Sequence, residues 1–156
     1  MMISSKGRYA LRVMLDLADC PPGSFVSLND IAYRQNISRK YLESIMNVLC
    51  KHALAESAVG KGGGYRLSRP PEEITAGQIL RAAEGQLIPV SCLDESGKKC
   101  SGECACSTLP FWRGLEERIN SYIDSYTLRD LVSMQGHRDS GDGPTAPATI
   151  NKGWSL

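Results

Sequence analysis

The stretch SLNDIAYRQNISRKYLESIMNVLCKHALAESAVGKGGGYRL, residues 27–67, decides the fold, because it predicts two short helices, a tight turn and a glycine-rich hairpin. Ser27 is an N-cap candidate, and Asp30 can meet the open amides of the first helical turn. This first helix should end near Gln35. An Asn-Ile-Ser turn follows, in which Ser38 is expected to cap the second helix.

The second helix should bury one face and leave the other to solvent. The apolar positions repeat every three or four residues, and the predicted buried stripe is Leu42, Ile45, Met46 and Leu49. Two helices joined by a tight turn are typical of the helix-turn-helix, whose second helix lies in the major groove of DNA. The alternative is a solvated helix face without a partner. On the first reading, contacts to phosphates or base edges are expected from Ser38, Arg39, Lys40, Tyr41, Glu43 and Ser44.

The glycine run at residues 60–64, GKGGG, predicts the tip of a hairpin wing between strands at 54–59 and 65–67. Lys61 and Arg66 are placed to meet phosphates or reach the minor groove. The small residues beside them let the backbone approach DNA, which adds Gly62 and Gly63 to the predicted interface. A nucleotide-binding P-loop is a poor alternative, since its spacing and its Ser or Thr after the lysine are missing.

The flanking segments predict further helices. Apolar residues three or four apart from residue 4 to 18 predict a helix that ends before Pro21, and a capped short helix is expected over 75–85. A long helix should begin near Pro110. Its apolar positions form one seam, which consists of Trp112, Leu115, Ile119, Tyr122, Ile123 and Tyr126. Pairing with a second copy would bury this seam, and packing on the chain's own winged domain is the alternative.

The expected fold is mainly α with a small β-hairpin wing. Residues 1–70 should form the winged helix-turn-helix domain, and 71–109 a connecting helix with a cysteine-rich loop. Residues 110–134 should hold the dimerisation helix and a following short helix. The polar, Gly- and Pro-rich residues 135–156 predict a flexible tail.

Charge is divided unevenly along the chain. Residues 1–70 carry ten Lys and Arg against five Asp and Glu, a net +5, whereas residues 71–156 carry eight against twelve, a net −4. The basic front half favours double-stranded DNA as its partner. No apolar run approaches the roughly 20 residues that span a bilayer, so we expect a cytoplasmic protein without a membrane partner. The two histidines, His52 and His137, form no catalytic pattern in the sequence, and neither an enzyme nor a small-molecule substrate is expected.

Four of the six cysteines lie within residues 90–112, namely Cys92, Cys100, Cys104 and Cys106. Cytosolic thiols stay reduced unless they bind metal or take part in redox chemistry. This grouping of cysteines therefore favours a metal site or a sensor. An iron-sulphur cluster, a thiol-disulfide switch and a structural zinc site remain open. Cys20 and Cys50 are expected to be buried small residues.

Five motifs together resemble a known family. The segments SSKGRYALRVMLDLA, ISRKYLESIMNVLCKHALAES, VGKGGGYRLSRP and ITAGQILRAAEG, with the run from Cys100 to Trp112, are similar to the IscR and NsrR type of winged-helix regulators, the Rrf-two family. The similarity covers about residues 1–134. It implies a dimeric, DNA-binding transcription regulator, often with an iron-sulphur cluster (2Fe-2S or 4Fe-4S) that senses cluster supply, nitric oxide or redox state. The other function considered is a metal- or thiol-dependent interaction protein that regulates a metabolic enzyme.

The resemblance also implies a ligand set. Cys92, Cys100 and Cys106 match the family's three ligand positions, because Trp112 follows the last of them by six residues. The family's usual fourth ligands are missing. Leu109 stands where the IscR type has a histidine, and Arg8 stands where the NsrR type has a carboxylate. Cys104 could complete a set of four thiolates. The wing departs from the family in one further residue, since Val59 replaces the arginine that is common before the first wing glycine.

Overall fold

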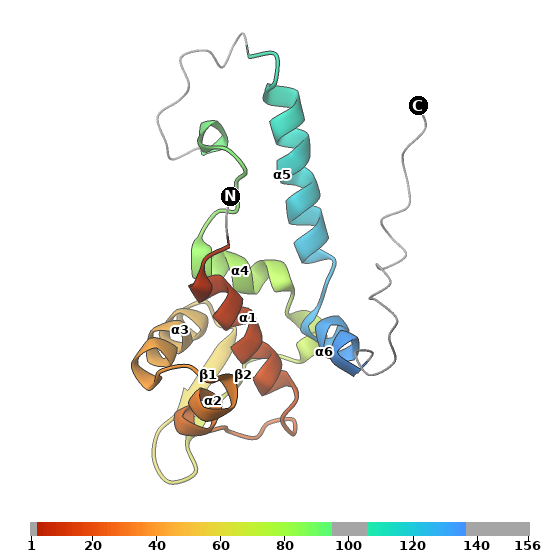
Figure 1. Ribbon diagram of the computed structural model, residues 1–156. Coiled ribbons are helices and arrows are strands. Elements are labelled where there is room, and N and C mark those ends of the chain that lie inside the picture. The colour runs from red at the N-terminus through yellow and green to blue at the C-terminus, as the bar shows by residue number, and fades with distance from the viewer. Residues whose placement is uncertain (1–2, 95–105, 137–156) are drawn as a thin grey trace.

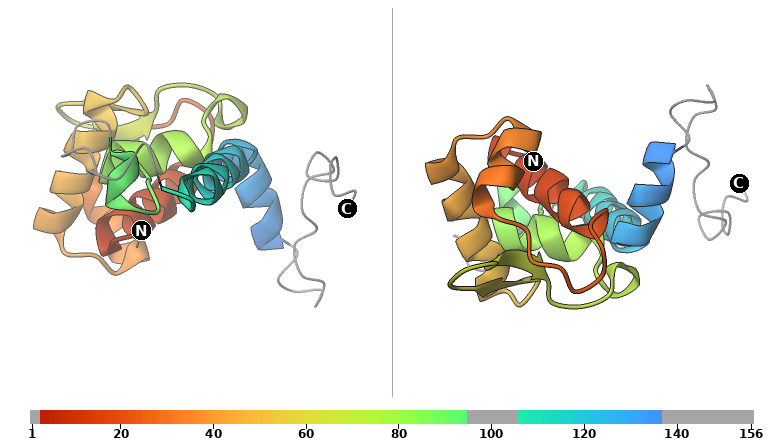
Figure 2. Two further views of the ribbon diagram at one scale, coloured as in Figure 1. Left: turned by 90° about the horizontal axis from the view of Figure 1, so that it is seen from above. Right: turned by 90° about the horizontal axis from the view of Figure 1, so that it is seen from below.

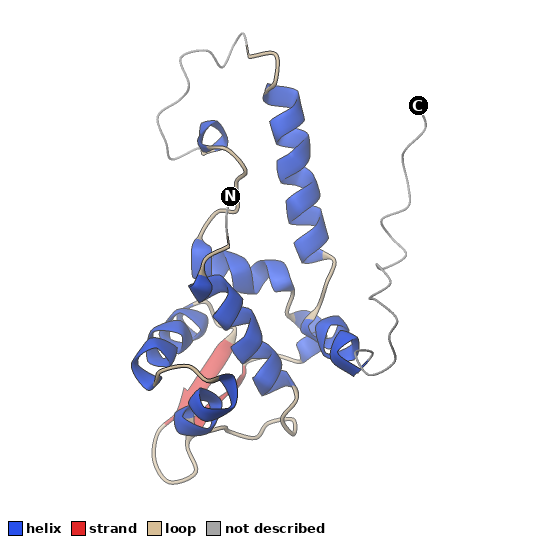
Figure 3. Ribbon diagram, in the orientation of Figure 1, coloured by secondary structure: helices blue, strands red, loops and turns tan. Residues whose placement is uncertain are grey.

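The computed structural model describes residues 3–94 and 106–136. This part of the chain is mostly helical and includes one two-stranded hairpin, as predicted (Figures 1 and 3). The elements are α1 (Ser5–Ala18), α2 (Leu28–Gln35), α3 (Arg39–Lys51), β1 (Ala55–Ala58), β2 (Gly64–Leu67), η1 (Pro71–Glu73), α4 (Ala76–Glu84), η2 (Ser91–Leu93), α5 (Leu109–Asp124) and α6 (Leu128–Gly136).

Side-chain caps fix where several helices begin. The hydroxyl of Ser27 accepts a hydrogen bond of 3.1 Å from the backbone N–H of Asp30, which confirms the predicted start of α2. A full capping box joins Thr75 and Gln78 at the start of α4. Ser38 is the N-cap residue of α3, as predicted, and has an extended backbone, but its side chain makes no cap hydrogen bond. The hydroxyl of Ser38 is exposed instead.

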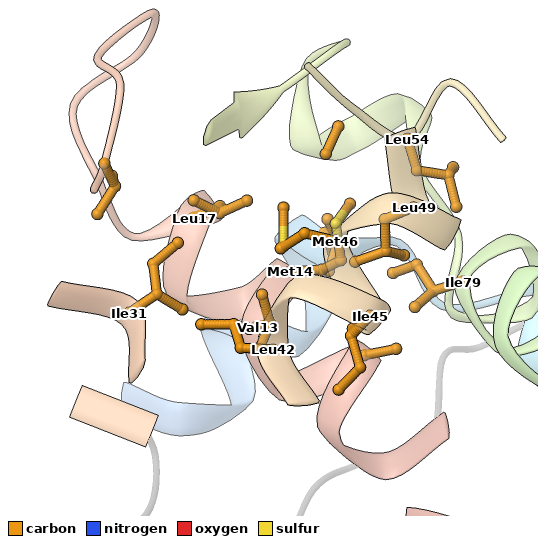
Figure 4. Packing of buried hydrophobic residues seen from close by; sticks show 14 of the residues in the cluster. Val13, Met14, Leu17, Ile31, Leu42, Ile45, Met46, Leu49, Leu54 and Ile79 are labelled. Carbon is orange, nitrogen blue, oxygen red and sulfur yellow. The ribbon is translucent and has the colours of Figure 1, made fainter. Parts of the chain in front are cut away.

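The hydrophobic core is built on one face of α1 (Figure 4). Ala10, Val13 and Met14 are inaccessible to solvent, and α2, α3, α4, α6 and β2 all pack against this helix. The predicted stripe of α3 is buried in full, at Leu42, Ile45, Met46 and Leu49. Burying one large aliphatic side chain contributes about 1.5–3 kcal/mol, so these residues fix α3 firmly on α1.

The hairpin is an antiparallel pair in which Ala55 lies opposite Leu67 and Ala58 lies opposite Gly64. Its root is tied to the segment before α2. Val26 and Tyr65 exchange two backbone hydrogen bonds, of 2.9 and 2.8 Å. The wing is therefore fixed relative to the helix-turn-helix at its base, while its tip projects from the body (Figure 1).

The long helix α5 projects from the rest of the molecule, and none of its residues is buried (Figure 1). Its polar side joins α4, because Arg81 donates to the Asn120 side chain at 3.0 Å and pairs with Asp124. The prediction for Tyr126 was wrong. This residue lies beyond the end of α5 and is buried in the body, where its carbonyl accepts from the N–H of Ala76 at 2.9 Å.

After α5 the chain turns back to the body. Helix α6 packs against α1 and η1, and it lies on the opposite side of the body from α3 (Figure 2). Within the described ranges, no helix has the length and apolar content needed to cross a membrane. The predicted tail, residues 135–156, begins two residues too early, because α6 runs to Gly136. Residues 137–156, like Cys100 and Cys104, lie outside the described residues.

The carboxylate of Glu84 ties the end of α4 to the start of α1. One oxygen accepts from the Ser4 N–H at 3.1 Å, the Ser4 hydroxyl at 2.6 Å and the Gly7 N–H at 2.9 Å. This carboxylate lies where a side chain at residue 7 would stand, so the contact requires glycine there. A negative charge among the first amides of a helix is favourable.

We expect Glu84→Ala to lower the free energy of unfolding by about 1–2 kcal/mol, because the donors of Ser4 and Gly7 lose their acceptor. Glu84→Gln keeps an acceptor oxygen and should cost less. Urea denaturation of both variants measures the difference. Wild-type stability in Glu84→Ala would show that the tie contributes nothing.

Candidate nucleic-acid interface and cysteine site

The outer face of α3 brings most of the predicted DNA-contacting side chains onto one surface. Arg39 and Lys40 are exposed, and the Nε of Arg39 lies 3.3 Å from a carboxylate oxygen of Glu43, one turn along the helix. The hydroxyl of Ser44 is also exposed and donates to the carbonyl of Tyr41 at 2.7 Å. This surface therefore carries cationic donors, a carboxylate acceptor and a hydroxyl group. Such groups can form hydrogen bonds with the edges of DNA bases.

Tyr41 differs from its neighbours because it is partly buried. Its ring packs edge-on against Tyr9 of α1, with ring centroids 5.9 Å apart and planes at 86°. The guanidinium of Arg12 lies 5.3 Å from the centre of the Tyr9 ring and donates to the carbonyl of Gln35 at the end of α2. These contacts join α1, α2 and α3, so Tyr41 has a structural role within the chain.

The wing tip is narrow and lined by backbone. Gly62 has φ +83°, which favours glycine. A side chain on Gly63 would collide with the carbonyl of Ala58. Lys61 is exposed between the glycines and has no hydrogen bond or ion pair with any residue in the described part of the chain. Its ammonium group is free to meet a phosphate.

Arg66, the second wing cation, is held by the protein itself. Its guanidinium pairs with Glu56 on the opposite strand at 2.9 Å and lies 4.6 Å from the centre of the Phe25 ring. It also donates to the carbonyl of Gly23 at 3.4 Å. Phosphate binding by Arg66 would compete with these contacts, and it stays a prediction.

A hollow of about 370 Å³ separates α3 from the wing. Arg39 and Glu43 line it on the α3 side, and Val59 and Gly63 line it on the wing side. Asn29 at the start of α2 also lines it. The sequence did not single out Asn29, because its place beside the wing depends on how α2 packs. The two elements predicted to contact DNA, α3 and the wing, thus lie on either side of this hollow.

The structure describes two of the four clustered cysteines. Cys92 lies in η2, after α4, and lines a hollow of about 820 Å³ together with Leu109, Arg113 and Glu116 of α5. Cys106 lies three residues before α5, and its carbonyl accepts from the N–H of Leu109. Cys100 and Cys104 lie outside the described residues, so the ligand set as a whole is a prediction. Within the described ranges, no three His, Cys, Asp or Glu side chains gather as a metal site.

The described thiols differ in their chemistry. A hydrogen bond between Cys106 and the Thr108 hydroxyl, whose oxygen lies 3.4 Å from the sulphur, lowers the pKa of Cys106 and favours the thiolate. Burial raises the pKa of Cys20 and Cys50. Both pack against the core but are only half-buried, so they are less buried than predicted. Thiolates are the form that binds iron or zinc, and Cys106 suits such a role.

Neither of the two positions that supply a fourth cluster ligand in the IscR and NsrR types holds a metal-binding side chain in this chain. Leu109 is apolar, and Arg8 is a cation whose guanidinium donates to the Ser5 hydroxyl at 3.0 Å. The sequence also did not single out Arg113 and Glu116, which line the hollow beside Cys92. Their three-residue spacing along α5 was the available signal, since it places them on one helix face.

Comparison with known proteins gives consistent results. The family described as Rrf2, iron-dependent transcriptional regulator, matches residues 3–134. The chain is 37% identical over 153 residues to the HTH-type transcriptional regulator IscR of Aliivibrio salmonicida. The aligned region covers 98% of this chain and 90% of the relative.

Two solved structures are similar in fold. CymR, the global cysteine regulator of B. subtilis, matches with a TM-score of 0.70 and 35% identity over 85% of this chain and 97% of its own. IscR of T. potens matches with a TM-score of 0.67 and 32% identity, over 93% of this chain and 94% of its own. The relative from Aliivibrio salmonicida is named as a transcriptional regulator and CymR as a global cysteine regulator, and transcriptional regulators are not enzymes.

Proposed function

Because the chain belongs to the Rrf2 family of DNA-binding transcription regulators, we propose that it acts in the cytoplasm as a homodimer whose DNA affinity depends on an iron-sulphur cluster. The observation that carries the DNA-binding part is the two-sided α3. Its apolar stripe is fully buried, and its polar face lies outside beside the exposed wing. This is the arrangement of a recognition helix that enters the major groove.

Each part of the interface has its own role in this proposal. Glu43, Ser44 and Arg39 read base edges, since carboxylate, hydroxyl and guanidinium groups match donors and acceptors in the major groove. Lys61 and Lys40 bind phosphates and contribute affinity without sequence preference. The N–H groups of Gly62 and Gly63 can approach the backbone of DNA, because no side chain stands between.

The outward face of α5 supports the homodimer. Phe111 and Tyr122 are 65% and 53% exposed, and Leu115 and Ile119 lie on the same side of the helix. The opposite side carries Asn120 and Asp124, which bind α4 of the same chain. The seam therefore faces away from its own body, and a second copy's α5 would bury it. Two copies related by a two-fold axis would present two recognition helices to a symmetric DNA site.

The donor set supports the cluster. Four thiolates are the simplest ligand set for iron-sulphur clusters, and the lowered pKa of Cys106 favours its thiolate. When bound, the cluster would supply a centre that responds to iron supply or oxidation. Cys92 and Cys106 would hold it with Cys100 and Cys104. These residues connect the end of α4 to the start of α5 in the sequence. Binding a cluster would fix this connection, and this would influence how the winged domain is held against the dimer axis.

A salt titration with variant proteins tests the DNA interface. Lys61→Ala should weaken binding to all sequences alike and reduce the slope of log affinity against log salt by about 0.9, which corresponds to one phosphate contact. Glu43→Ala and Ser44→Ala should change sequence preference, because they remove base contacts. Mobility shifts against a selected site and a scrambled duplex measure both effects. If neither α3 variant alters affinity or preference, the base-reading role of this face is wrong.

A charge in the α5 seam tests the homodimer. Ile119→Asp should give monomers, because an unpaired carboxylate in an apolar contact is costly. Ser121→Asp, on another face of the same helix, adds the same charge outside the seam and should stay dimeric. Light scattering measures both masses. An unchanged mass for Ile119→Asp would place the interface elsewhere.

Metal analysis tests the ligand set. Anaerobically purified protein should contain iron and acid-labile sulphide, and Cys92→Ala, Cys100→Ala and Cys106→Ala should lose both together with their visible absorbance. Cys104→Ala should also lose the cluster if Cys104 is the fourth ligand. Cys20→Ala and Cys50→Ala are matched controls that should keep it. Full iron content in Cys92→Ala or Cys106→Ala would contradict this ligand set, and zinc without iron in the wild type would favour a structural zinc site.

A further inference from the structure

Asp16, near the end of α1, differs from the other paired carboxylates in the described part of the chain because it is removed from solvent. Its side chain is 8% exposed, whereas the other carboxylates in ion pairs are 44–51% exposed. A buried carboxylate is costly to desolvate, so it is stable only where hydrogen-bond donors surround it. The donors around Asp16 all come from α2.

Three hydrogen bonds join Asp16 to the last two residues of α2. Arg34 donates from Nε to Oδ1 at 2.9 Å and from Nη2 to Oδ2 at 2.6 Å. The side-chain amide of Gln35 donates to Oδ1 at 3.0 Å. A guanidinium that pairs with a carboxylate through two bonds is fixed in direction as well as in distance.

The network continues from Gln35 to a second residue of α1. Because the amide nitrogen of Gln35 faces Asp16, its amide oxygen faces away, and this oxygen accepts from the Nε of Arg12 at 3.2 Å. Arg12 also donates from Nη2 to the backbone carbonyl of Gln35 at 3.0 Å, which satisfies one of the carbonyls left open at a helix end. Arg12 and Asp16 are one turn apart, so α1 holds the end of α2 at two points on one face.

Apolar packing alone holds α2 weakly. Ile31 is the one residue of α2 that is buried, and Ile37 is buried in the turn after it. Leu28 and Ala32 are only partly buried. Two buried anchors leave the helix able to rotate about the line that joins them. The polar contacts at the end of α2 supply the third point that fixes this rotation.

The start of α3 depends on the position of α2. Three residues, 36–38, connect the two helices, and the first buried residue of α3 is Leu42. Arg39 and Lys40 therefore precede the apolar stripe that fixes the rest of α3, and their direction follows from the turn. In a helix-turn-helix the first helix crosses the DNA backbone, and the early residues of the second helix contact base edges.

We propose that Asp16 is a positioning residue for DNA recognition. Through Arg34 and Gln35 it holds α2 and the start of α3 at the angle that base contacts require. This inference rests on the proposed role of α3 as the recognition helix. Loss of the carboxylate would weaken contacts to base edges, which depend on exact placement, and would leave the attraction of Lys61 to phosphates unchanged.

A ratio of two affinities measures this role. Wild-type protein first selects a site from a random duplex library, and each variant is then titrated with that site and with a scrambled duplex. Asp16→Asn keeps the size of the side chain but turns an amide donor toward Arg34 or Gln35. We expect the ratio to fall about tenfold, which is the discrimination that one base contact supplies. The affinity for the scrambled duplex should stay within about twofold, because it depends on phosphates.

A second variant keeps the test independent of the stability of Asp16→Asn. The side chain of Arg34 is 42% exposed, so Arg34→Gln leaves no uncompensated charge except that of Asp16, which still accepts from Gln35. Arg34→Gln should lower the ratio in the same direction. Circular dichroism sets the temperature of the titrations, at which every variant must be folded.

Two control variants separate positioning from a loss of stability. Glu84→Ala removes the tie between α4 and the start of α1, and it is also expected to be less stable than the wild type. Glu72→Gln weakens the ion pair between Glu72 and Arg129, which joins η1 to α6. Neither contact involves α2 or α3, so both controls should keep the wild-type ratio.

An exchange of two side chains tests the order of donors and acceptors. In the double variant Asp16→Asn, Gln35→Glu, the amide at position 16 can accept from Arg34 and donate to the carboxylate at position 35, which can still accept from Arg12. The net charge of the chain does not change. The double variant should recover most of the ratio that Asp16→Asn loses.

The outcomes separate this inference from the proposed function. If wild-type protein prefers the selected site and both Asp16→Asn and Arg34→Gln keep its ratio, Asp16 has no positioning role and the role of α3 stands. An equal fall of the ratio in Glu84→Ala, or no recovery in the double variant, would also overturn the inference. Wild-type protein without any preference for the selected site would overturn the proposed function as well.

Discussion

The buried face of α1 is the constraint on which the rest of the structure depends. Ala10, Val13 and Met14 are inaccessible to solvent, and the other helices of the body meet on them. A polar residue at any of these positions would lose its hydration without gaining a partner, so the face admits only apolar side chains. The apolar stripe of α3 is covered by α1, α2, α4 and β1, so the polar face of α3 lies outside. The surface proposed to contact DNA thus follows from the packing around α1.

Two joints connect the winged domain to the long helix, and they differ in strength. Glu84 binds the end of α4 to the start of α1 through three donors, which makes α4 part of the rigid body. The joint between α4 and α5 combines Arg81, whose partly exposed side chain reaches Asn120 and Asp124, with backbone hydrogen bonds just beyond α5, from Ala76 to Tyr126 and from Leu128 to Ile74. An exposed ion pair contributes only about 0–1 kcal/mol. The backbone bonds therefore hold the C-terminal end of α5 more than the ion pair does, and the cysteine segment leads into the other end of this helix.

The sequence predicted the elements that depend on local chemistry. The cap at Ser27, the stripe of α3 and the glycine wing each follow from residues within a few positions of one another, and the structure contains them. It could not predict contacts between distant residues. Gly7 and Glu84 are 77 positions apart, and nothing local marks their hydrogen bond. Tyr126 continued the spacing of the seam, but α5 ends at Asp124 and the bend beyond it turns Tyr126 into the core. The DNA-contacting residues and the cysteine ligands remain predictions.

The surface cations differ in the contacts within the protein that each would lose on binding a phosphate or a base. Arg66 is joined to Glu56 and stacked near Phe25, so moving it to a phosphate would break contacts that hold the hairpin to the body. Lys61 has no such partner among the described residues and loses only water. Arg39 lies between these cases, since its pair with Glu43 is exposed and within one helix, where such pairs contribute about 0.3–0.5 kcal/mol. A base edge can replace that pair at little cost. Arg39 and Lys61 are thus available to DNA, whereas Arg66 serves first to hold the wing that carries Lys61.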